Sequence, residues 1–148
     1  CKDRLDHSLA EARRNRQMSA VMFLDLDGFK EINDAHGHEF GDRVLKSIAD
    51  RIRAKIRETD TVARIGGDEF VIISSSLPES TIAERIASSL IWQISRPIHI
   101  GEIEVAVSAS IGISFYPDNG ATAEELIRSA DKAMYEVKRK GRNAYGFA

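Results

Sequence analysis

Thr61-Val-Ala-Arg-Ile-Gly-Gly-Asp-Glu-Phe-Val-Ile-Ile73 contains two short apolar runs joined by a polar tip. Residues 61–65 and 70–73 are rich in β-branched and aromatic side chains, which favour strands. Between them, Gly66-Gly67-Asp68-Glu69 has the glycines of a hairpin turn. The stretch therefore predicts a β-hairpin with two adjacent carboxylates at its tip. The glycines alone indicate no ligand, because Gly-Gly turns also occur for purely steric reasons.

Further carboxylates follow the first apolar run of the chain. Residues 20–24 are continuously apolar, which predicts a buried strand, and they lead into Asp25-Leu-Asp-Gly28. If this strand is a neighbour of the hairpin, Asp25 converges with Asp68 and Glu69. Carboxylate oxygens suit Mg²⁺, or Mn²⁺, whose remaining positions nucleotide phosphates can fill. The alternative is that these acids are solvated turn residues.

The other segments predict helices that cover a sheet. Apolar residues recur at three- and four-residue steps over residues 3–17, 39–57, 80–95 and 126–137, the last run ending before Gly141. Residues 98–100 and 103–115 alternate like paired strands with Gly101-Glu102 as their turn. This order predicts an α+β fold with a central, mainly antiparallel sheet and helices on its faces.

Length and composition exclude several classes of protein. The 148 residues, 43% hydrophobic and 30% charged, fit one globular domain. A net charge of −2 gives no overall attraction to nucleic acid, and we expect no nucleic-acid partner. Cys1 is the only cysteine, no apolar run is long enough to span a bilayer, and no initiator methionine is present. We therefore expect a cytoplasmic domain that is a fragment of a longer protein.

Motifs along almost the whole chain resemble those of GGDEF domains, the catalytic domains of diguanylate cyclases. The resemblance rests on residues 23–30, 32–34, 37–38, 41–42, 64–70, 110–112, 130–131, 133–135 and 138–143. It implies one GGDEF domain over residues 1–148, with a sheet like that of nucleotidyl cyclases and polymerase palm domains. An Asp-x-Leu-Thr, Asn-Arg segment is expected just before the first residue of the sequence.

The resemblance also implies a role for individual residues. Asp25, the carbonyl of Leu26 and Asp68 would ligate Mg²⁺, and Glu69 would reach a second metal. Asp68 or Glu69 would accept the proton of the ribose 3′-hydroxyl. The residues that would contact GTP are Asn33 and Asp42 at the guanine edge, His38 close to the nucleotide, and Lys30, Lys138 and Arg142 at the β- and γ-phosphates, with Lys30 counted among the catalytic residues.

Some of these residues have simpler interpretations. Asn33 and Asp34 ahead of Gly37 are typical of a turn or a helix cap. Lys138 and Arg142 lie near a helix end, where the helix dipole alone favours basic residues.

Two functions are compatible with this resemblance. The first is an enzyme that condenses two GTP molecules into cyclic di-GMP and releases two pyrophosphates, which requires a homodimer because each domain holds one GTP. The alternative is a catalytically idle module that binds GTP or cyclic di-GMP and regulates an attached C-terminal EAL phosphodiesterase domain. With either function, we expect that the domain can belong to a membrane-anchored bacterial protein.

Arg57 and Asp60 have the spacing of the Arg-x-x-Asp inhibitory site found in many GGDEF domains. The resemblance implies that the product, cyclic di-GMP, binds there and inhibits. The alternative is a salt bridge between two residues three positions apart.

Overall fold

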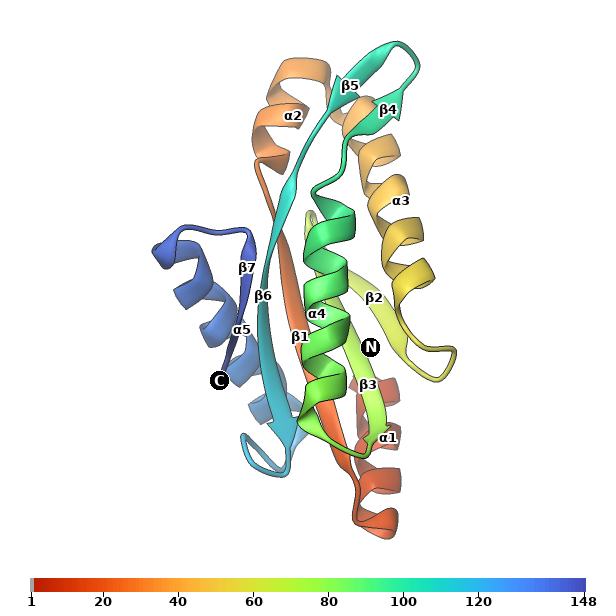
Figure 1. The fold of residues 1–148 in the computed structure, drawn as a ribbon, viewed down its shortest axis with the longest axis vertical. Coiled ribbons are helices and arrows are strands. Elements are labelled where there is room, and N and C mark those ends of the chain that lie inside the picture. The colour runs from red at the N-terminus through yellow and green to blue at the C-terminus, as the bar shows by residue number, and fades with distance from the viewer. Residues whose placement is uncertain (1) are drawn as a thin grey trace.

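The computed structural model describes residues 2–148 except the side chains of Lys2 and Arg4, and Cys1 lies outside the described residues. Five strands form one sheet in the order β2-β3-β1-β6-β7, and β4 and β5 form a separate two-stranded sheet (Figure 1). The elements in chain order are α1 (Lys2–Asn15), β1 (Met18–Asp27), α2 (Phe29–His36), α3 (His38–Lys55), β2 (Thr61–Gly66), β3 (Glu69–Leu77), α4 (Ser80–Ile94), β4 (Ile98–Ile100), β5 (Ile103–Val105), β6 (Ser108–Tyr116), α5 (Ala123–Lys140) and β7 (Ala144–Phe147).

β1 is the central strand of the five-stranded sheet. It pairs antiparallel with β3 on one side and with β6 on the other. Within residues 2–148, the β6–β7 pair is the one parallel pair. Nearly every residue of β1 is buried, as expected for a strand that is covered on both faces. The predicted α+β class and mainly antiparallel sheet are confirmed.

Alternate residues of β1 face two different helix layers. Ala20, Met22 and Leu24 belong to the core that includes the apolar faces of α3 and α4. Val21 and Phe23 belong to a second core, with α1 and α5. This alternation follows from the two-residue period of a strand, and it directs Asp25 and Asp27 toward the layer that contains α5.

α5 lies very close to the sheet at Gly112 of β6. A Cβ atom at this position would collide with the backbone carbonyl of Ala130 and the backbone amide of Met134. Helix backbone therefore lies directly on strand backbone, and this contact fixes the distance between α5 and the sheet.

Two predicted boundaries near the first strand differ from the structure. β1 continues through Asp25 to Asp27, because hydrogen bonds from Ser108 and Ser110 satisfy the buried carboxylate of Asp27. Asn33 and Asp34, for which a turn or a helix cap was one interpretation, lie within α2, which is followed by Gly37 at φ 90°. Gly37 separates α2 from α3, since this φ is accessible to glycine at little cost.

The predicted strand over residues 103–115 is wrong as a single element. Only residues 103–105 pair with β4, and a new strand begins at Ser108 and pairs with β1. The first part is largely exposed and the second almost wholly buried, so burial in the main sheet separates them. Strand β7 was not predicted, because four residues that follow the turn at residues 141–143 give little periodicity.

Among the described residues, no helix has the length and apolarity needed to cross a membrane.

Candidate functional site

The two acidic segments lie next to each other at one end of the sheet. Asp25 of β1 is directly opposite Glu69 of β3 in the antiparallel register. The backbone amide of Leu26 donates a hydrogen bond to the carbonyl of Asp68 over 3.1 Å, which ties the hairpin tip to β1. The predicted adjacency of these acids is thus confirmed.

Asp25 is a carboxylate with an unsatisfied, buried oxygen. Its Oδ2 lies 3.2 Å from the ammonium of Lys138, while its Oδ1 has no hydrogen-bond partner. Burial, and then the nearby charge of Asp68, raise the pKa of Asp25 to about 6 although Lys138 opposes the shift. A cation other than Lys138 would therefore be stabilised next to Oδ1.

Glu69 bends back over the hairpin turn. A Cβ atom on Gly66 would lie 2.7 Å from Glu69 Oε1, so the glycine leaves space for this carboxylate. Burial, Asp68 and then Asp131 raise the pKa of Glu69, while Lys138 opposes the increase. Asp131 of α5 thus adds a negative charge that the sequence analysis placed in a motif without assigning it a role.

The donor atoms at this end of the sheet fit a hard divalent cation. Across residues 2–148, no three His, Cys, Asp or Glu side chains are already grouped as a metal site. For the first metal ion the resemblance implies two carboxylates, Asp25 and Asp68, with the Leu26 carbonyl, and it assigns Glu69 to a second ion. Such a set suits Mg²⁺, which typically takes one or two protein carboxylates and completes its shell with water and phosphate oxygens. The unpartnered Oδ1 of Asp25 is the observation that supports this fit.

Asp27 is a buried acid whose hydrogen bonds are satisfied within the protein. It accepts from Ser108 Oγ at 2.7 Å, Ser110 Oγ at 2.9 Å, Lys138 Nζ at 3.2 Å and the Asn143 backbone amide at 3.2 Å. Burial alone would raise its pKa, but these hydrogen bonds, those of the serines first, hold the pKa below its usual value. Sequence reasoning missed this role. The signal in the sequence that could have indicated it is the pair Ser108 and Ser110, two positions apart at the start of a strand.

Asn33 and Asp42 come together between α2 and α3. The Asn33 side chain lies where a Cβ on Gly41 would be, and its Oδ1 has no hydrogen-bond partner. Asp42, the next residue, lines a cavity of about 310 Å³ with Leu45 and Phe70 among its other walls. An amide oxygen without a partner therefore lies against Gly41, and the next residue in the chain carries an exposed carboxylate. Both groups suit recognition of a base edge.

The other residues predicted to contact GTP are not assembled with the acids. Lys30, His38 and Arg142 are exposed. Within residues 2–148, no hydrogen bond or ion pair joins the side chain of any of the three to Asp25, Asp68 or Glu69. Lys138 is the only residue of the predicted phosphate group that contacts an acid in the described part of the chain.

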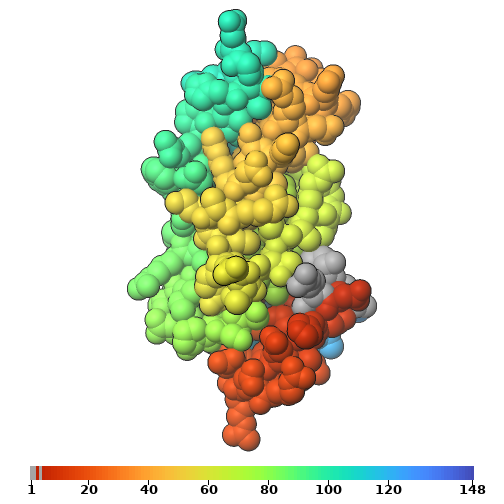
Figure 2. All heavy atoms as spheres, turned by 90° about the vertical axis from the view of Figure 1, so that its right-hand side faces the viewer, coloured from red at the N-terminus to blue at the C-terminus, as the bar shows by residue number. Residues whose placement is uncertain are grey.

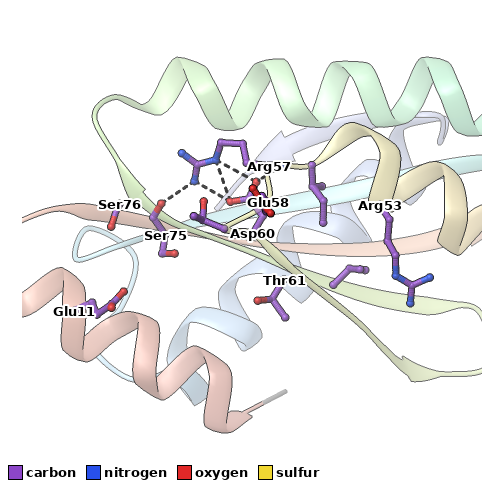
Figure 3. Close-up of a pocket in the computed structure, with 11 residues that line it drawn as sticks. Glu11, Arg53, Arg57, Glu58, Asp60, Thr61, Ser75 and Ser76 are labelled. Atoms are coloured by element: carbon purple, nitrogen blue, oxygen red, sulfur yellow. Dashed lines mark hydrogen bonds and ion pairs between the residues drawn. The ribbon is translucent and has the colours of Figure 1, made fainter.

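Arg57 and Asp60 form an ion pair in a hollow whose lining residues do not include Asp25, Asp68 or Glu69 (Figure 3). Arg57 Nη2 donates to Asp60 Oδ1 at 2.8 Å and to the carbonyl of Ser75 at 2.7 Å, and the Arg57 amide donates to Asp60 Oδ2 at 2.9 Å. The Arg57 side chain is 34% exposed and that of Asp60 0%. The hollow has a volume of about 670 Å³ and is also lined by Glu11 and Arg53.

On the face of the molecule shown in Figure 2, α3 lies between the β4–β5 hairpin at one end and α1 at the other.

Known proteins share both the sequence and the fold. The family model described as "Diguanylate cyclase, GGDEF domain" matches residues 1–144. The bifunctional diguanylate cyclase/cyclic di-GMP phosphodiesterase MucR of Pseudomonas aeruginosa is 49% identical over 98% of this chain, which spans 21% of MucR. Diguanylate cyclase TpbB of the same organism is 44% identical over 95% of this chain, which spans 33% of TpbB. The chain thus spans about a fifth to a third of these curated relatives.

Solved structures give the same result. A crystal structure of the TpbB GGDEF domain has a TM-score of 0.97 at 43% identity, over 99% of this chain and 92% of that one. The GGDEF domain of DgcB from Caulobacter crescentus, crystallised in complex with c-di-GMP, has a TM-score of 0.86 at 29% identity, over 98% of this chain and 86% of that one. This chain therefore belongs to the GGDEF family of diguanylate cyclase domains.

Proposed function

We propose that this domain condenses two GTP molecules into cyclic di-GMP and releases two pyrophosphates. The observation that supports the proposal most strongly is the unsatisfied Asp25 Oδ1, buried beside the hairpin that presents Asp68 and Glu69. Leaving a buried carboxylate oxygen without a partner lowers stability, and binding of a cation with a triphosphate offsets that effect.

The chain's own groups suit each part of this reaction. Asp25, the Leu26 carbonyl and Asp68 would hold Mg²⁺ or Mn²⁺, and Glu69 would reach a second ion. The bound metal would neutralise charge on the phosphates and lower the pKa of the attacking hydroxyl. Asp68 or Glu69 would take the 3′-hydroxyl proton, and burial together with the charge of Asp68 raises the pKa of Glu69, which makes Glu69 a stronger base.

Basic side chains would orient the triphosphate. Lys138 already lies at the acids, and Lys30 and Arg142 would close on the β- and γ-phosphates from exposed positions. Arg142 can bind two phosphate oxygens at once through its planar guanidinium. His38, at the start of α3, would lie next to the nucleotide.

Turnover requires two domains. The 3′-hydroxyl of one GTP attacks the α-phosphorus of the other and pyrophosphate leaves, twice, so two sites must face each other in a homodimer. Since GTP is the substrate, we place the domain in the cytoplasm, and the full-length protein could add an EAL domain or a membrane anchor.

The second candidate function is an idle module that binds GTP or cyclic di-GMP and regulates an EAL phosphodiesterase domain. Cyclic di-GMP phosphodiesterase PdeR of Escherichia coli favours it, since that protein is 39% identical over 97% of this chain and has only the phosphodiesterase activity in its name. Incubation with GTP and Mg²⁺, followed by chromatographic separation of nucleotides, distinguishes the two. The enzyme converts two GTP into one cyclic di-GMP, whereas the idle module returns GTP unchanged.

Asp42→Ala is expected to weaken GTP binding about tenfold or more and to leave ATP binding nearly unchanged. The lost carboxylate accepts from the N1 and N2 donors of guanine, which adenine lacks at those positions. Fluorescence titration with labelled GTP and ATP measures both affinities. An equal loss for the two nucleotides would refute recognition of the base by Asp42.

Product inhibition through Arg57 and Asp60 is part of the same proposal. Both Asp60 oxygens are engaged by Arg57, so Asp60 acts as the anchor that orients the guanidinium. The exposed part of Arg57 faces the hollow, where a cyclic dinucleotide offers phosphate and guanine acceptors. The DgcB domain, crystallised in complex with c-di-GMP, supports binding of this ligand by a domain of the same fold.

Arg57→Ala is expected to lower the affinity for cyclic di-GMP at least about tenfold, because a charge-assisted contact is lost. Isothermal titration calorimetry measures the affinity. The matched control is Arg85→Ala, which removes an exposed arginine of α4 outside the hollow. Unchanged affinity in Arg57→Ala would mean that the product binds elsewhere.

A further inference from the structure

Asp27 cannot be a free metal or substrate ligand in this arrangement. Its side chain is 5% exposed, and both of its oxygens accept hydrogen bonds. Yet one of its donors, Lys138, is itself proposed to orient the triphosphate, and another, the backbone amide of Asn143, directly follows Arg142, which is proposed to do the same. Asp27 thus connects the start of β6, through Ser108 and Ser110, to the C-terminal end of α5, through Lys138.

The turn after α5 has an unfavourable backbone conformation. Arg142 has φ 67° and Asn143 φ 51°, in the left-handed region that side chains other than glycine rarely adopt. The amide of Asn143 donates to Asp27 Oδ2, and the amide of Arg142 donates to the carbonyl of Val137. These two hydrogen bonds stabilise the turn, and the conformation of the turn determines the position of the Arg142 side chain.

Lys138 is shared between two acids. Its ammonium lies 3.2 Å from Asp25 Oδ2 and 3.2 Å from Asp27 Oδ1. A cation at Asp25 competes with Lys138 for that carboxylate. Asp27 remains as the partner that keeps Lys138 in place, with the other N–H bonds of its ammonium free for a phosphate oxygen.

We propose that Asp27 is a positioning residue for triphosphate binding, acting through Lys138 and through the turn that presents Arg142. The proposal rests on the proposed function in one respect, namely that the ligand is a nucleoside triphosphate. It assigns to Asp27 neither metal ligation nor contact with substrate.

The test is Asp27→Asn, which keeps the shape of the side chain but removes its charge and turns an NH₂ group toward donors. Affinities for a non-hydrolysable GTP analogue and for guanosine are measured by calorimetry in the presence of Mg²⁺. The analogue is expected to bind about tenfold more weakly and guanosine equally well, because the guanine contacts at Asn33 and Asp42 are untouched. Hydrogen exchange at the Asn143 amide is expected to accelerate about tenfold.

Two further variants keep the test decisive. Ser114→Ala removes another buried hydroxyl, which donates to the carbonyl of Leu126, and it controls for lost stability without an effect on the analogue. The double variant Ser108→Ala/Ser110→Ala removes two of the hydrogen bonds that hold the Asp27 carboxylate, and it is expected to weaken analogue binding about threefold. If Asp27→Asn does not fold, this double variant tests the proposal in its place.

The outcomes separate this inference from the proposed function. Equal analogue affinity in wild type and the Asp27 variant, or equal losses for analogue and guanosine, overturns the positioning role and leaves the proposed function standing. A wild-type domain that binds no triphosphate overturns the proposed function itself.

Discussion

Asp68→Asn is expected to lower the rate of cyclic di-GMP formation by about two to three orders of magnitude. An amide is a poor ligand for Mg²⁺ and cannot accept the hydroxyl proton as a carboxylate does. The residue is in the turn between β2 and β3, outside the two apolar cores, so the fold should be unaffected. Initial rates at saturating GTP, measured chromatographically, give the effect.

A matched control is Asp118→Asn, which makes the same chemical change at an exposed loop position. Its rate should equal that of wild type. If Asp68→Asn kept more than about a tenth of the wild-type rate, the metal and base roles of Asp68 would be wrong.

Gly112→Ala is expected to lower the free energy of unfolding by about 3 kcal/mol, the upper part of the range for overpacked cores. The added methyl group would meet backbone atoms of Ala130 and Met134, which cannot move away as a flexible side chain can. α5 must then shift from the sheet, and Lys138 moves with it away from Asp25. Urea unfolding followed by circular dichroism measures the change.

Gly67→Ala is the control for this prediction. A Cβ atom at Gly67 would have no neighbour within 4 Å, and its φ is outside the left-handed region. Stability should change by less than about 0.5 kcal/mol. Similar stability losses in the two variants would show that close approach of α5 is not the cause.

The sequence predicted the parts of the fold where local pattern and burial agree. The hairpin of residues 61–73 and the helices over residues 39–57 and 80–95 match β2, β3, α3 and α4 within a few residues. The junction of Asp25 with Asp68 and Glu69 was also predicted, because acids that follow core strands meet when the strands are neighbours.

Other features depend on contacts between distant segments. The break between β5 and β6 and the addition of β7 follow from burial and pairing in the assembled sheet, which the alternation of residues 103–115 does not show. The role of Asp27 depends on residues as far away as Asn143. The Arg57–Asp60 ion pair, given as an alternative to product binding, is present, while product binding there stays a prediction.

The central claim is that two of these domains together convert GTP into cyclic di-GMP at Asp25, Asp68 and Glu69. It is tested most directly by the initial rate of cyclic di-GMP formation at saturating GTP and Mg²⁺ over a wide range of protein concentrations. The account predicts product whose rate per domain rises with concentration as dimers form, and no product when Mg²⁺ is removed with a chelator. GTP that is bound but unconverted at every concentration would contradict it.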